Sequence, residues 1–494
     1  MGGNGDSLRW WVLLTVIIGT FLGRLDQTIV NLALPSIMQD FSITVSEAGW
    51  IATAYILANA IFVPVWGKLG DTIGRKKVYI WGFLIFIAGS VLAGLAWDLN
   101  SMIFFRIIQA IAGSADYPTA MAIIAVTFRG AKERAEALGI WSGAFAASAV
   151  LGPLLGGPLI DTFGWRAVFL INLPVGVLGL AMAMIFVRES VSERRGVQFD
   201  IWGAITLGIT LSALVLVLDK GLDWGWLSLE AVSCYLAMLV FGYMFYRIDS
   251  VHPEPVVDFK FFRIGAFVGA LTNNFTVFMG MIGGVFLIPV FVQTFLGYDA
   301  TETGFLFMPM AVGMMVAVPL GSRLVGRVSP GTVIAISTFV AAIGILMFIG
   351  LDARSGPLDI VIPVFVMASG MGFGMAQRTN IIASAVPEEE IGVASSVLAL
   401  VRNIAGAFGI AIFTTILKNA TEGALLAISE NSVINTHDPS ILGQVAALMM
   451  LKAQITGFHA VFIIASGILF ASAALAFLMI RVREKKSGVE VFVE

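Results

Sequence analysis

Six charged side chains interrupt long apolar stretches of this sequence. They are Arg24, Asp26, Arg106, Asp116, Arg378 and Arg402. A charge inside an apolar segment of membrane length costs several kcal/mol unless it is paired or hydrated, so such residues are functional by default. Carboxylates can take up and release protons, and arginines can hold them in place or bind anions. The chemistry that these residues indicate is proton binding inside a membrane.

Composition supports this interpretation. Of the 494 residues, 58% are hydrophobic and 12% are charged, against about 25% charged in soluble proteins. The mean hydropathy is +0.94, which excludes a soluble or disordered protein. One cysteine, Cys234, excludes internal disulfides, and three histidines argue against a metal site. We expect no cofactor, no metal and, at a net charge of −3, no nucleic-acid partner.

Apolar runs broken by charged, Gly, Pro, Asp or Asn residues predict an all-α polytopic membrane protein with fourteen spans. The spans are 11–35, 49–69, 78–97, 102–126, 137–160, 166–187, 201–219, 227–246, 265–295, 302–322, 331–350, 358–383, 392–416 and 458–481. Most of the 29 basic residues fall in the termini and in loops on the same side. Positive loops stay inside, so we expect both termini in the cytoplasm.

Asp26 and Arg106 match in depth. At about 1.5 Å per residue, Asp26 lies about 22 Å and Arg106 about 24 Å from the cytoplasmic face of a roughly 30 Å core. Gln109 shares the face of Arg106 at i+3 and could bond the same carboxylate. Two interpretations stay open: a permanent pair that holds two helices together, or a pair that loosens when Asp26 takes a proton. Arg24 points to another side of its helix and needs a different partner.

Asp116 lies lower in the fourth span, in the sequence Gly113-Ser-Ala-Asp-Tyr-Pro118, about 9 Å above the cytoplasmic face. No basic residue of the first span matches that depth. An unpaired carboxyl group at low dielectric favours its protonated form and would suit a proton carrier. The alternative is an aspartate hydrogen-bonded to Tyr117 or to the backbone freed by Pro118.

A turn between the second and third spans carries Gly67-Lys-Leu-Gly-Asp71-Thr-Ile-Gly74-Arg75-Lys-Lys. Its glycines permit close backbone approach, Asp71 suits the positive end of the next helix, and the basic cluster suits anionic lipid headgroups. This segment resembles the signature loop of the major facilitator superfamily, so Gly67, Asp71, Gly74 and Arg75 are expected to form its conformational switch.

Three further stretches are similar to the fourteen-span drug–proton antiporter branch of that superfamily. They are the segment 25–35, the antiporter motif Gly152-Pro153-Leu-Leu-Gly156-Gly157, and 392–396 with Arg402 and Asn403. The resemblance implies two six-helix bundles around a central cavity plus a two-helix insert. The corresponding ranges are 1–190 for the first bundle, 196–248 for the insert and 264–484 for the second bundle.

Several polar residues are candidates for the substrate cavity. They are Asp26, Gln109, Asp116, Tyr117, Asn273 and Asn274. The two asparagines could bind substrate or act as glue between helices. Arg402 is expected to stabilise its bundle through helix carbonyls and Ser396 or Asn403. An aromatic cage for a cation would need Tyr55, Trp141 and Tyr117 to converge, and the external segment 418–457 carries an amphipathic stretch at 441–455.

These residues predict a transporter and not an enzyme, because no catalytic constellation or nucleotide-binding loop is present. We expect a monomer in the cytoplasmic membrane of a prokaryote, in contact with lipids. It would export amphipathic, cationic drugs or toxic compounds in exchange for protons, with Asp26, Asp116 and Arg106 as the coupling residues. The alternative is a proton-coupled exporter of a metabolite, lipid or siderophore on the same scaffold.

Overall fold

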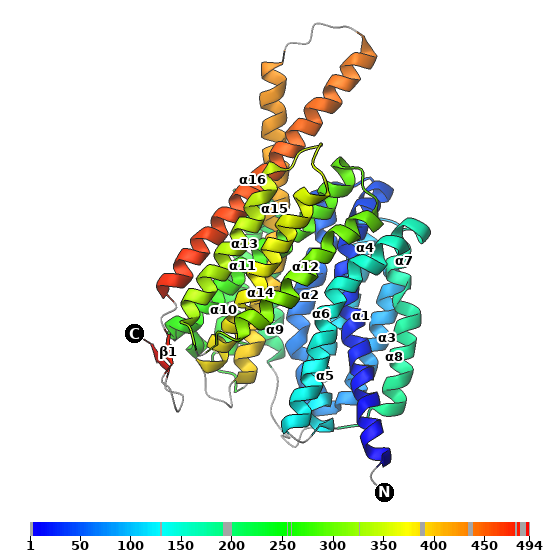
Figure 1. The fold of residues 1–494 in the computed structure, drawn as a ribbon, viewed down its shortest axis with the longest axis vertical. Coiled ribbons are helices and arrows are strands. Elements are labelled where there is room, and N and C mark those ends of the chain that lie inside the picture. Colours follow the sequence, from blue (N-terminus) through cyan, green and yellow to red (C-terminus); the bar gives the residue numbers. More distant parts are fainter. Residues whose placement is uncertain are drawn as a thin grey trace.

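The chain folds into a bundle of long helices with a helical hairpin projecting from one end (Figure 1). The computed structural model describes residues 3–128, 131–190, 200–253, 255–257, 259–325, 327–385, 391–432, 438–479, 482–484 and 491–493. Apart from a short antiparallel pair of strands near the C-terminus, β1 (Val482–Glu484) and β2 (Val491–Val493), the regular structure of these residues is helical.

The first half of the chain contains eight helices. They are α1 (Gly3–Phe41), α2 (Val45–Ile73), α3 (Arg75–Gly94), α4 (Leu99–Gly113), α5 (Asp116–Thr127), α6 (Ala131–Phe163), α7 (Arg166–Leu170) and α8 (Asn172–Phe186). Two helices follow as a pair, α9 (Ile201–Trp224) and α10 (Leu229–Asp249), and they pack against each other. The pair contacts both halves of the molecule, because α9 packs on α2 and on α15.

The second half consists of six long helices and two 3-10 turns. They are η1 (Phe259–Arg263), α11 (Gly265–Phe295), α12 (Ala300–Ser322), α13 (Pro330–Met347), η2 (Phe348–Gly350), α14 (Pro357–Ser384), α15 (Ile391–Asn431) and α16 (Pro439–Met479). Among the described residues, thirteen helices are long and apolar enough to cross a membrane. The chain is therefore a multi-pass membrane protein, as predicted. Helix α6 covers the remaining predicted span, 137–160, and parts of it lie outside the residues whose side chains are described.

Two predicted spans are broken. The span 102–126 divides into α4 and α5 at Ser114 and Ala115, and the span 166–187 divides into α7 and α8 at Ile171. Each break lies just before a proline, Pro118 or Pro174, that cannot donate its backbone hydrogen bond and disturbs the preceding turn. Each predicted span nevertheless remains one candidate membrane crossing, Leu99–Thr127 or Arg166–Phe186, and each break places polar residues at a helix start.

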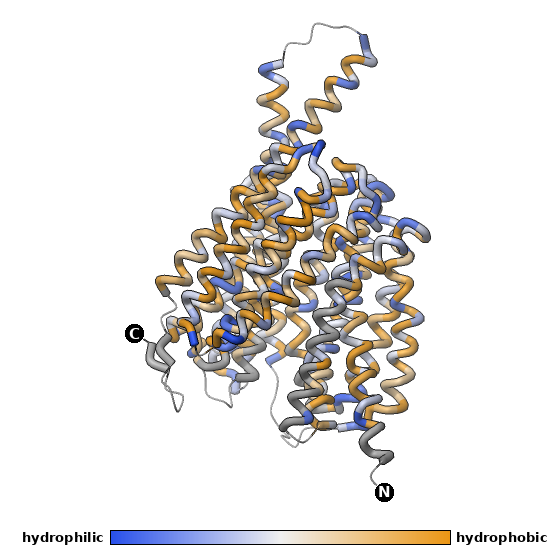
Figure 2. Tube along the Cα trace, viewed as in Figure 1, coloured by the Kyte–Doolittle hydropathy of each residue, from blue (hydrophilic) through white to orange (hydrophobic). Residues whose placement is uncertain are grey.

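The segment predicted as an external connection, 418–457, is helical for most of its length. Helix α15 continues to Asn431 and α16 begins at Pro439, so the two spans extend as a hairpin beyond the bundle (Figure 1). Figure 2 shows hydrophilic residues recurring along this projecting part, in contrast to the apolar helices below it. The amphipathic stretch 441–455 is thus the first part of α16 and not a separate surface helix. At its start, hydrogen bonds from Ser440 lower the pKa of Asp438.

The two halves share one hydrophobic core at the end from which the hairpin projects, called the hairpin end below. Leu34 of α1, Phe291 of α11 and Phe413 of α15 belong to this core. At the opposite end the cores are separate. One lies within the first half around Phe83 and Trp141. Another joins the second half to the α9–α10 pair around Phe267, and among the described residues α2 is the helix of the first half that contributes to it. The bundles are therefore packed together more extensively at the hairpin end.

The antiporter motif lies where α6 approaches both α1 and α12. Gly152 and Gly156 face Thr28 and Ile29 of α1, and a side chain at Gly157 would clash with the backbone at the start of α12. The glycines therefore permit the close packing that the sequence predicts for this helix. Because α12 belongs to the second bundle, this contact joins the two halves at the hairpin end.

Candidate functional site

The first buried cluster centres on Asp26 of α1. Its Oδ2 accepts a hydrogen bond from Arg106 Nη1 at 2.5 Å, and its Oδ1 accepts one from Gln109 Nε2 at 2.9 Å. The predicted ion pair between α1 and α4 is therefore present, with Gln109 in the predicted role. Arg106 also donates to Gln109 Oε1 at 2.6 Å, so the three side chains form a closed triangle.

Two further members of this cluster were missed by the sequence analysis. Asn172, the first residue of α8, donates to Asp26 Oδ1 at 2.9 Å, and Ser90 of α3 accepts from both Gln109 and Asn172. Both lie on helices whose rotation cannot be read from hydropathy. The available signal was that each is a polar residue inside a predicted span.

The Asp26 cluster is sealed from solvent. Asp26, Arg106 and Gln109 are 0–2% exposed, and the Arg106 guanidinium stacks over the Tyr55 ring at 4.0 Å. Three donors therefore hold the buried carboxylate. Tyr55 is engaged by Arg106 and does not join an aromatic cage, whereas Tyr117 and Trp141 do lie together, with ring centroids 5.4 Å apart.

Asp116, at the start of α5, has fewer partners. Its Oδ2 accepts from the Thr20 hydroxyl at 2.7 Å, and Trp141 Nε1 donates to that same hydroxyl at 2.9 Å. Its Oδ1 is buried and has no hydrogen bond of good geometry among the described residues, although the Tyr79 hydroxyl lies nearby. Neither predicted alternative partner, Tyr117 or the backbone near Pro118, is used. Thr20 on α1 was not foreseen.

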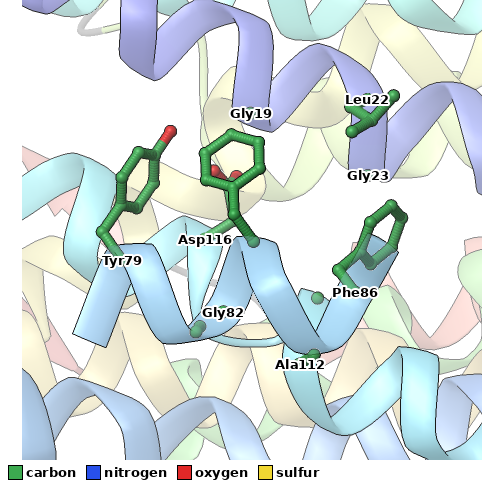
Figure 3. A pocket seen from close by; sticks show the side chains of 11 residues that line it. Gly19, Leu22, Gly23, Tyr79, Gly82, Phe86, Ala112 and Asp116 are labelled. Atoms are coloured by element: carbon green, nitrogen blue, oxygen red, sulfur yellow. The ribbon is translucent and has the colours of Figure 1, made fainter. Parts of the chain in front are cut away.

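A small cavity adjoins this carboxyl group between α1, α3 and the α4–α5 break (Figure 3). Gly19 and Gly23 border it on α1, Tyr79 and Phe86 on α3, and Asp116 on α5. About 30 Å³ is open to the centres of water molecules, which is room for one or two waters but not for a drug. The cavity borders the side of Asp116 that lacks a well-aligned donor, and apart from Tyr79 and Asp116 its lining side chains are apolar.

Arg24 and Tyr117 lie near the same carboxyl group. Arg24 donates to Gln27 at 2.9 Å and interacts electrostatically with Asp116, Tyr117 and Tyr55. A basic residue of the first span thus does act on Asp116, contrary to the depth estimate, because the arginine side chain is long enough to bridge the difference. Tyr117 is 41% exposed, so the aromatic pair that it forms with Trp141 has an open side.

The signature loop is shorter than predicted. Helix α2 continues to Ile73, and the reversal occurs at Gly74, whose φ of +116° suits glycine alone. The Glu189 carboxylate accepts from Lys76 N at 3.1 Å and so occupies the start of α3. The side chain of Asp71, predicted for this role, lies outside the described residues, while Gly67 is part of α2.

A second buried cluster centres on Arg378 of α14. Its guanidinium donates to Asn273 Oδ1 at 2.8 Å, Ser337 Oγ at 2.8 Å and Thr338 Oγ1 at 3.0 Å. Arg378 is 1% exposed and forms no ion pair with any described carboxylate. Sequence analysis noted this arginine without assigning it a role. Asn273 also donates to Ser472 at 2.9 Å, so its amide is used between helices, as in the glue alternative.

Arg402 lies on α15 beside Asn274 of α11. Its Nε is 3.5 Å from Asn274 Oδ1, its Nη2 is 3.5 Å from Thr379 Oγ1, and its guanidinium lies 4.9 Å from the Phe278 ring centre. These are long contacts, and among the described residues they are made in place of the predicted contact to Asn403. Asn403 instead reaches Asn59 of α2 at 3.5 Å, and the side chain of Ser396 is outside the described set.

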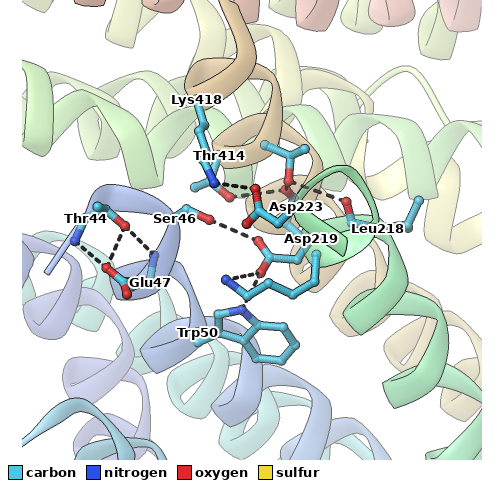
Figure 4. Close-up of polar contacts among 12 residues, drawn as sticks. Thr44, Ser46, Glu47, Trp50, Leu218, Asp219, Asp223, Thr414 and Lys418 are labelled. Atoms are coloured by element: carbon cyan, nitrogen blue, oxygen red, sulfur yellow. Dashed lines mark hydrogen bonds and ion pairs between the residues drawn. The ribbon is translucent and has the colours of Figure 1, made fainter. Parts of the chain in front are cut away.

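Polar contacts also join the two bundles at the hairpin end. Asp161, at the end of α6, accepts from the backbone N–H groups of Ala300 and Thr301 at 3.2 and 2.8 Å. The carboxylate thus sits at the positive start of α12. The insert is tied in nearby, where Asp219 of α9 accepts from Trp50 of α2 at 2.6 Å (Figure 4). Both contacts strengthen the closure of this end.

Comparison with known proteins assigns this chain to a family. The family model described as Major Facilitator Superfamily matches residues 16–410. The multidrug transporter protein MdtP of Bacillus subtilis is 32% identical over 431 residues, covering 86% of this chain and 78% of the relative. The multidrug resistance protein Stp of Mycobacterium tuberculosis is 30% identical over 436 residues, covering 88% and 81%.

Solved structures agree with the fold. A bacterial homologue of the human lysosomal transporter Spinster, in an inward-facing and occupied conformation, superposes with a TM-score of 0.67 over 95% of this chain and 96% of that one. Its sequence identity is 16%, so the likeness concerns the fold alone.

Proposed function

Since this chain belongs to the major facilitator superfamily and is a transporter of small molecules, not an enzyme, we propose that it exports amphipathic drugs or toxic compounds in exchange for protons by alternating access. Its multidrug-resistance relatives support drug efflux. The proton, its carrier residue and the charge of the substrate are our proposal. The observation that carries it is the contrast between the two buried aspartates of the first bundle.

Asp116 is the proton carrier in this proposal. A carboxylate whose buried Oδ1 accepts no well-aligned hydrogen bond is costly to keep ionised, and protonation removes that charge. The small cavity beside it offers a path for water and protons. Asp26, by contrast, already accepts from three donors and gains little from a proton. We therefore assign Asp26 and Arg106 the permanent-pair alternative and Asp116 the coupling role.

Protonation of Asp116 changes the charge around the exposed Tyr117. With the carboxylate ionised, it balances Arg24, and a substrate amine near Tyr117 meets a favourable field and an aromatic face. With the carboxyl protonated, its negative charge is lost and the field at the amine becomes less favourable. Proton and amine therefore compete, which is the condition for exchange. This competition is the reason to propose cationic substrates, as the sequence predicts.

The remaining features of the proposal concern the cell. We propose fourteen spans, with the two-helix insert between two six-helix bundles, in the cytoplasmic membrane of a prokaryote. Both termini lie in the cytoplasm and the hairpin lies outside. The conformation closed at the hairpin end would then face inward, supported by the separate cores at the opposite end. We propose that the protein works as a monomer and that lipids contact its basic loops.

The test is proton release on substrate binding. Purified protein in weakly buffered detergent receives tetraphenylphosphonium, a lipophilic cation, while pH is followed with an indicator dye. We expect release from the native protein and from Asp352→Asn, which removes an exposed carboxylate, and no release from Asp116→Asn. Asp26→Asn should still release protons.

Two outcomes contradict the proposal. Release that survives Asp116→Asn but disappears in Asp26→Asn would transfer the coupling role to Asp26. Absence of release from the native protein, with tetraphenylphosphonium shown to bind, would exclude competition between cation and proton.

A further inference from the structure

The second bundle presents a donor site next to the bundle interface. Arg402 is half-buried, and its two hydrogen-bond contacts, to Asn274 and Thr379, are both 3.5 Å long. Ordinary N–H···O bonds are about 2.9–3.0 Å, so these contacts leave most of the donor capacity of the guanidinium unused. This differs from Arg378, which is held by several bonds of 2.8–3.2 Å.

Asn274 adds a second unused donor. The side chain is 0% exposed, and its Nδ2 has no hydrogen-bond partner among the described residues. Its Oδ1 faces Arg402, which fixes the orientation of the amide because the reverse orientation would set two donors against each other. A buried amide donor without an acceptor is costly, and a ligand acceptor bound between Asn274 and Arg402 would remove this cost.

The surroundings of this site are electropositive. Arg378 interacts electrostatically with Arg402, and neither arginine forms an ion pair with a carboxylate in the described part of the chain. Across the interface, Arg402 also interacts with Arg24 and Tyr117 of the first bundle. The site therefore lies near the exposed Tyr117, with a concentration of positive charge on its own side.

We propose that Arg402 and Asn274 bind an acidic group of the substrate, a carboxylate or an equivalent anion. The guanidinium supplies charge and paired donors, and the asparagine amide supplies one more donor, a combination suited to a planar carboxylate. The apolar body of the ligand would lie toward Phe278 and toward Tyr117.

This inference rests on the proposed function and narrows its substrate class. An amine at the Tyr117 side competes with the proton on Asp116, whereas an acid at Arg402 anchors the other end of the same molecule. The preferred substrates are therefore amphipathic zwitterions, and a purely cationic compound uses only half of the site. The second bundle thus contributes selectivity for an acidic group that the carboxylates of the first bundle cannot provide.

A matched series of fluorescent ligands tests the proposal. We would use 3-(1-pyrenyl)alanine, its methyl ester and its N-acetyl derivative, which share one apolar body and carry a zwitterionic, cationic or anionic head. Binding to the full-length protein in nanodiscs is measured by energy transfer from tryptophan to pyrene at mildly acidic pH, with empty nanodiscs subtracted. We expect the zwitterion to bind most tightly.

Arg402→Gln should weaken binding of the zwitterion and of the N-acetyl derivative by about tenfold or more, because one charge-assisted interaction is lost. Binding of the methyl ester should stay within about twofold of its affinity for the native protein. Arg354→Gln, which removes an exposed arginine at the hairpin end, should change none of the three. Equal weakening of all three ligands by Arg402→Gln would show that the arginine only supports the fold, and would overturn the proposal.

Asn274→Asp gives a second readout with almost no change of volume. A carboxylate beside Arg402 would occupy the guanidinium, so binding of the anion should fall by about tenfold or more and the ester should become the preferred ligand. Unchanged preference would contradict the site. Failure of the proposed function looks different: the acid would still bind through Arg402, but no ligand of the series would release a proton.

Discussion

In the described part of the chain, each half buries one arginine almost completely, Arg106 or Arg378, and the two are stabilised in different ways. Arg106 faces the carboxylate of Asp26 at 2.5 Å, whereas Arg378 is surrounded by neutral oxygens of Asn273, Ser337 and Thr338. The first arrangement is an ion pair, and in the second a buried cation is stabilised by hydrogen bonds to uncharged groups. Both occur at a crossing of several helices, so both hold a bundle together.

The difference indicates which half of the molecule can bind and release a proton. Arginine does not lose its proton in proteins, so the Arg378 cluster keeps its charge through any transport cycle. Carboxylates can change charge, and the described membrane-buried ones near the bundle centre, Asp26 and Asp116, both belong to the first half. In the proposed exchange, the second half presents a fixed positive field while Asp116 in the first half titrates, which would separate ligand selection from coupling.

The largest effect is expected for Arg106→Gln. This variant leaves the Asp26 carboxylate buried without its counter-charge, and breaking a buried ion pair typically costs about 3–5 kcal/mol. The free energy of unfolding of the purified protein, measured by denaturant titration in one detergent, should fall by about that amount.

A double variant isolates the ion pair from the rest of the cluster. Arg106→Gln with Asp26→Asn removes both charges and should be more stable than Arg106→Gln alone by about 1–3 kcal/mol, because no unpaired charge remains. If the double variant is no more stable than the single one, Asp26 is not ionised in the folded protein and the contrast between the clusters disappears.

An intermediate effect is expected for Arg378→Gln, about 1–2 kcal/mol in the same measurement. Loss of the guanidinium leaves Asn273 Oδ1 short of a donor, but it also removes a buried charge that no carboxylate balances. Ser337 and Thr338 retain bonds to the carbonyl of Ile334. A loss as large as that of Arg106→Gln would mean that the second cluster conceals a counter-charge.

The smallest effect is expected for Ser337→Ala. Its hydroxyl is one of several acceptors around Arg378, and removing one neutral hydrogen bond costs about 0.5–1.5 kcal/mol. The comparison variant Ser90→Ala, in the Asp26 cluster, should cost a similar amount, because Gln109 and Asn172 keep their bonds to Asp26. A loss of stability confined to one of the two variants would show that the neutral hydrogen bond stabilises one cluster and not the other.

The sequence could predict the residues at the centre of the Asp26 cluster but not the polar residues that surround them. Asp26, Arg106 and Gln109 follow from depth along two helices and from i+3 spacing, which depend only on helix geometry. Ser90, Asn172 and Thr20 depend on how separate helices rotate against one another, and a single sequence contains no such information. For the same reason the partners of Arg378 and Arg402 could be found only in three dimensions.

Hydropathy predicted where apolar helices lie but not where helices end. The extensions of α15 and α16 are polar enough to resemble a loop, yet both are helical. Glycine occurs in them at Gly423, Gly443 and Gly457, and Pro439 is the first residue of α16, a position where proline is tolerated. Inside the spans, Pro118 and Pro174 follow helix breaks that a hydropathy profile does not reveal.

The projecting hairpin has a practical consequence for imaging. Helix α15 runs about 20 Å past its predicted membrane exit at residue 416, and α16 returns beside it. A transporter of 52.7 kDa whose mass lies mostly inside a detergent belt offers few features for aligning electron micrographs, and two similar bundles are easily confused with each other. A projecting pair of helices rooted in the second half marks both that half and the hairpin end, so this protein carries its own alignment marker.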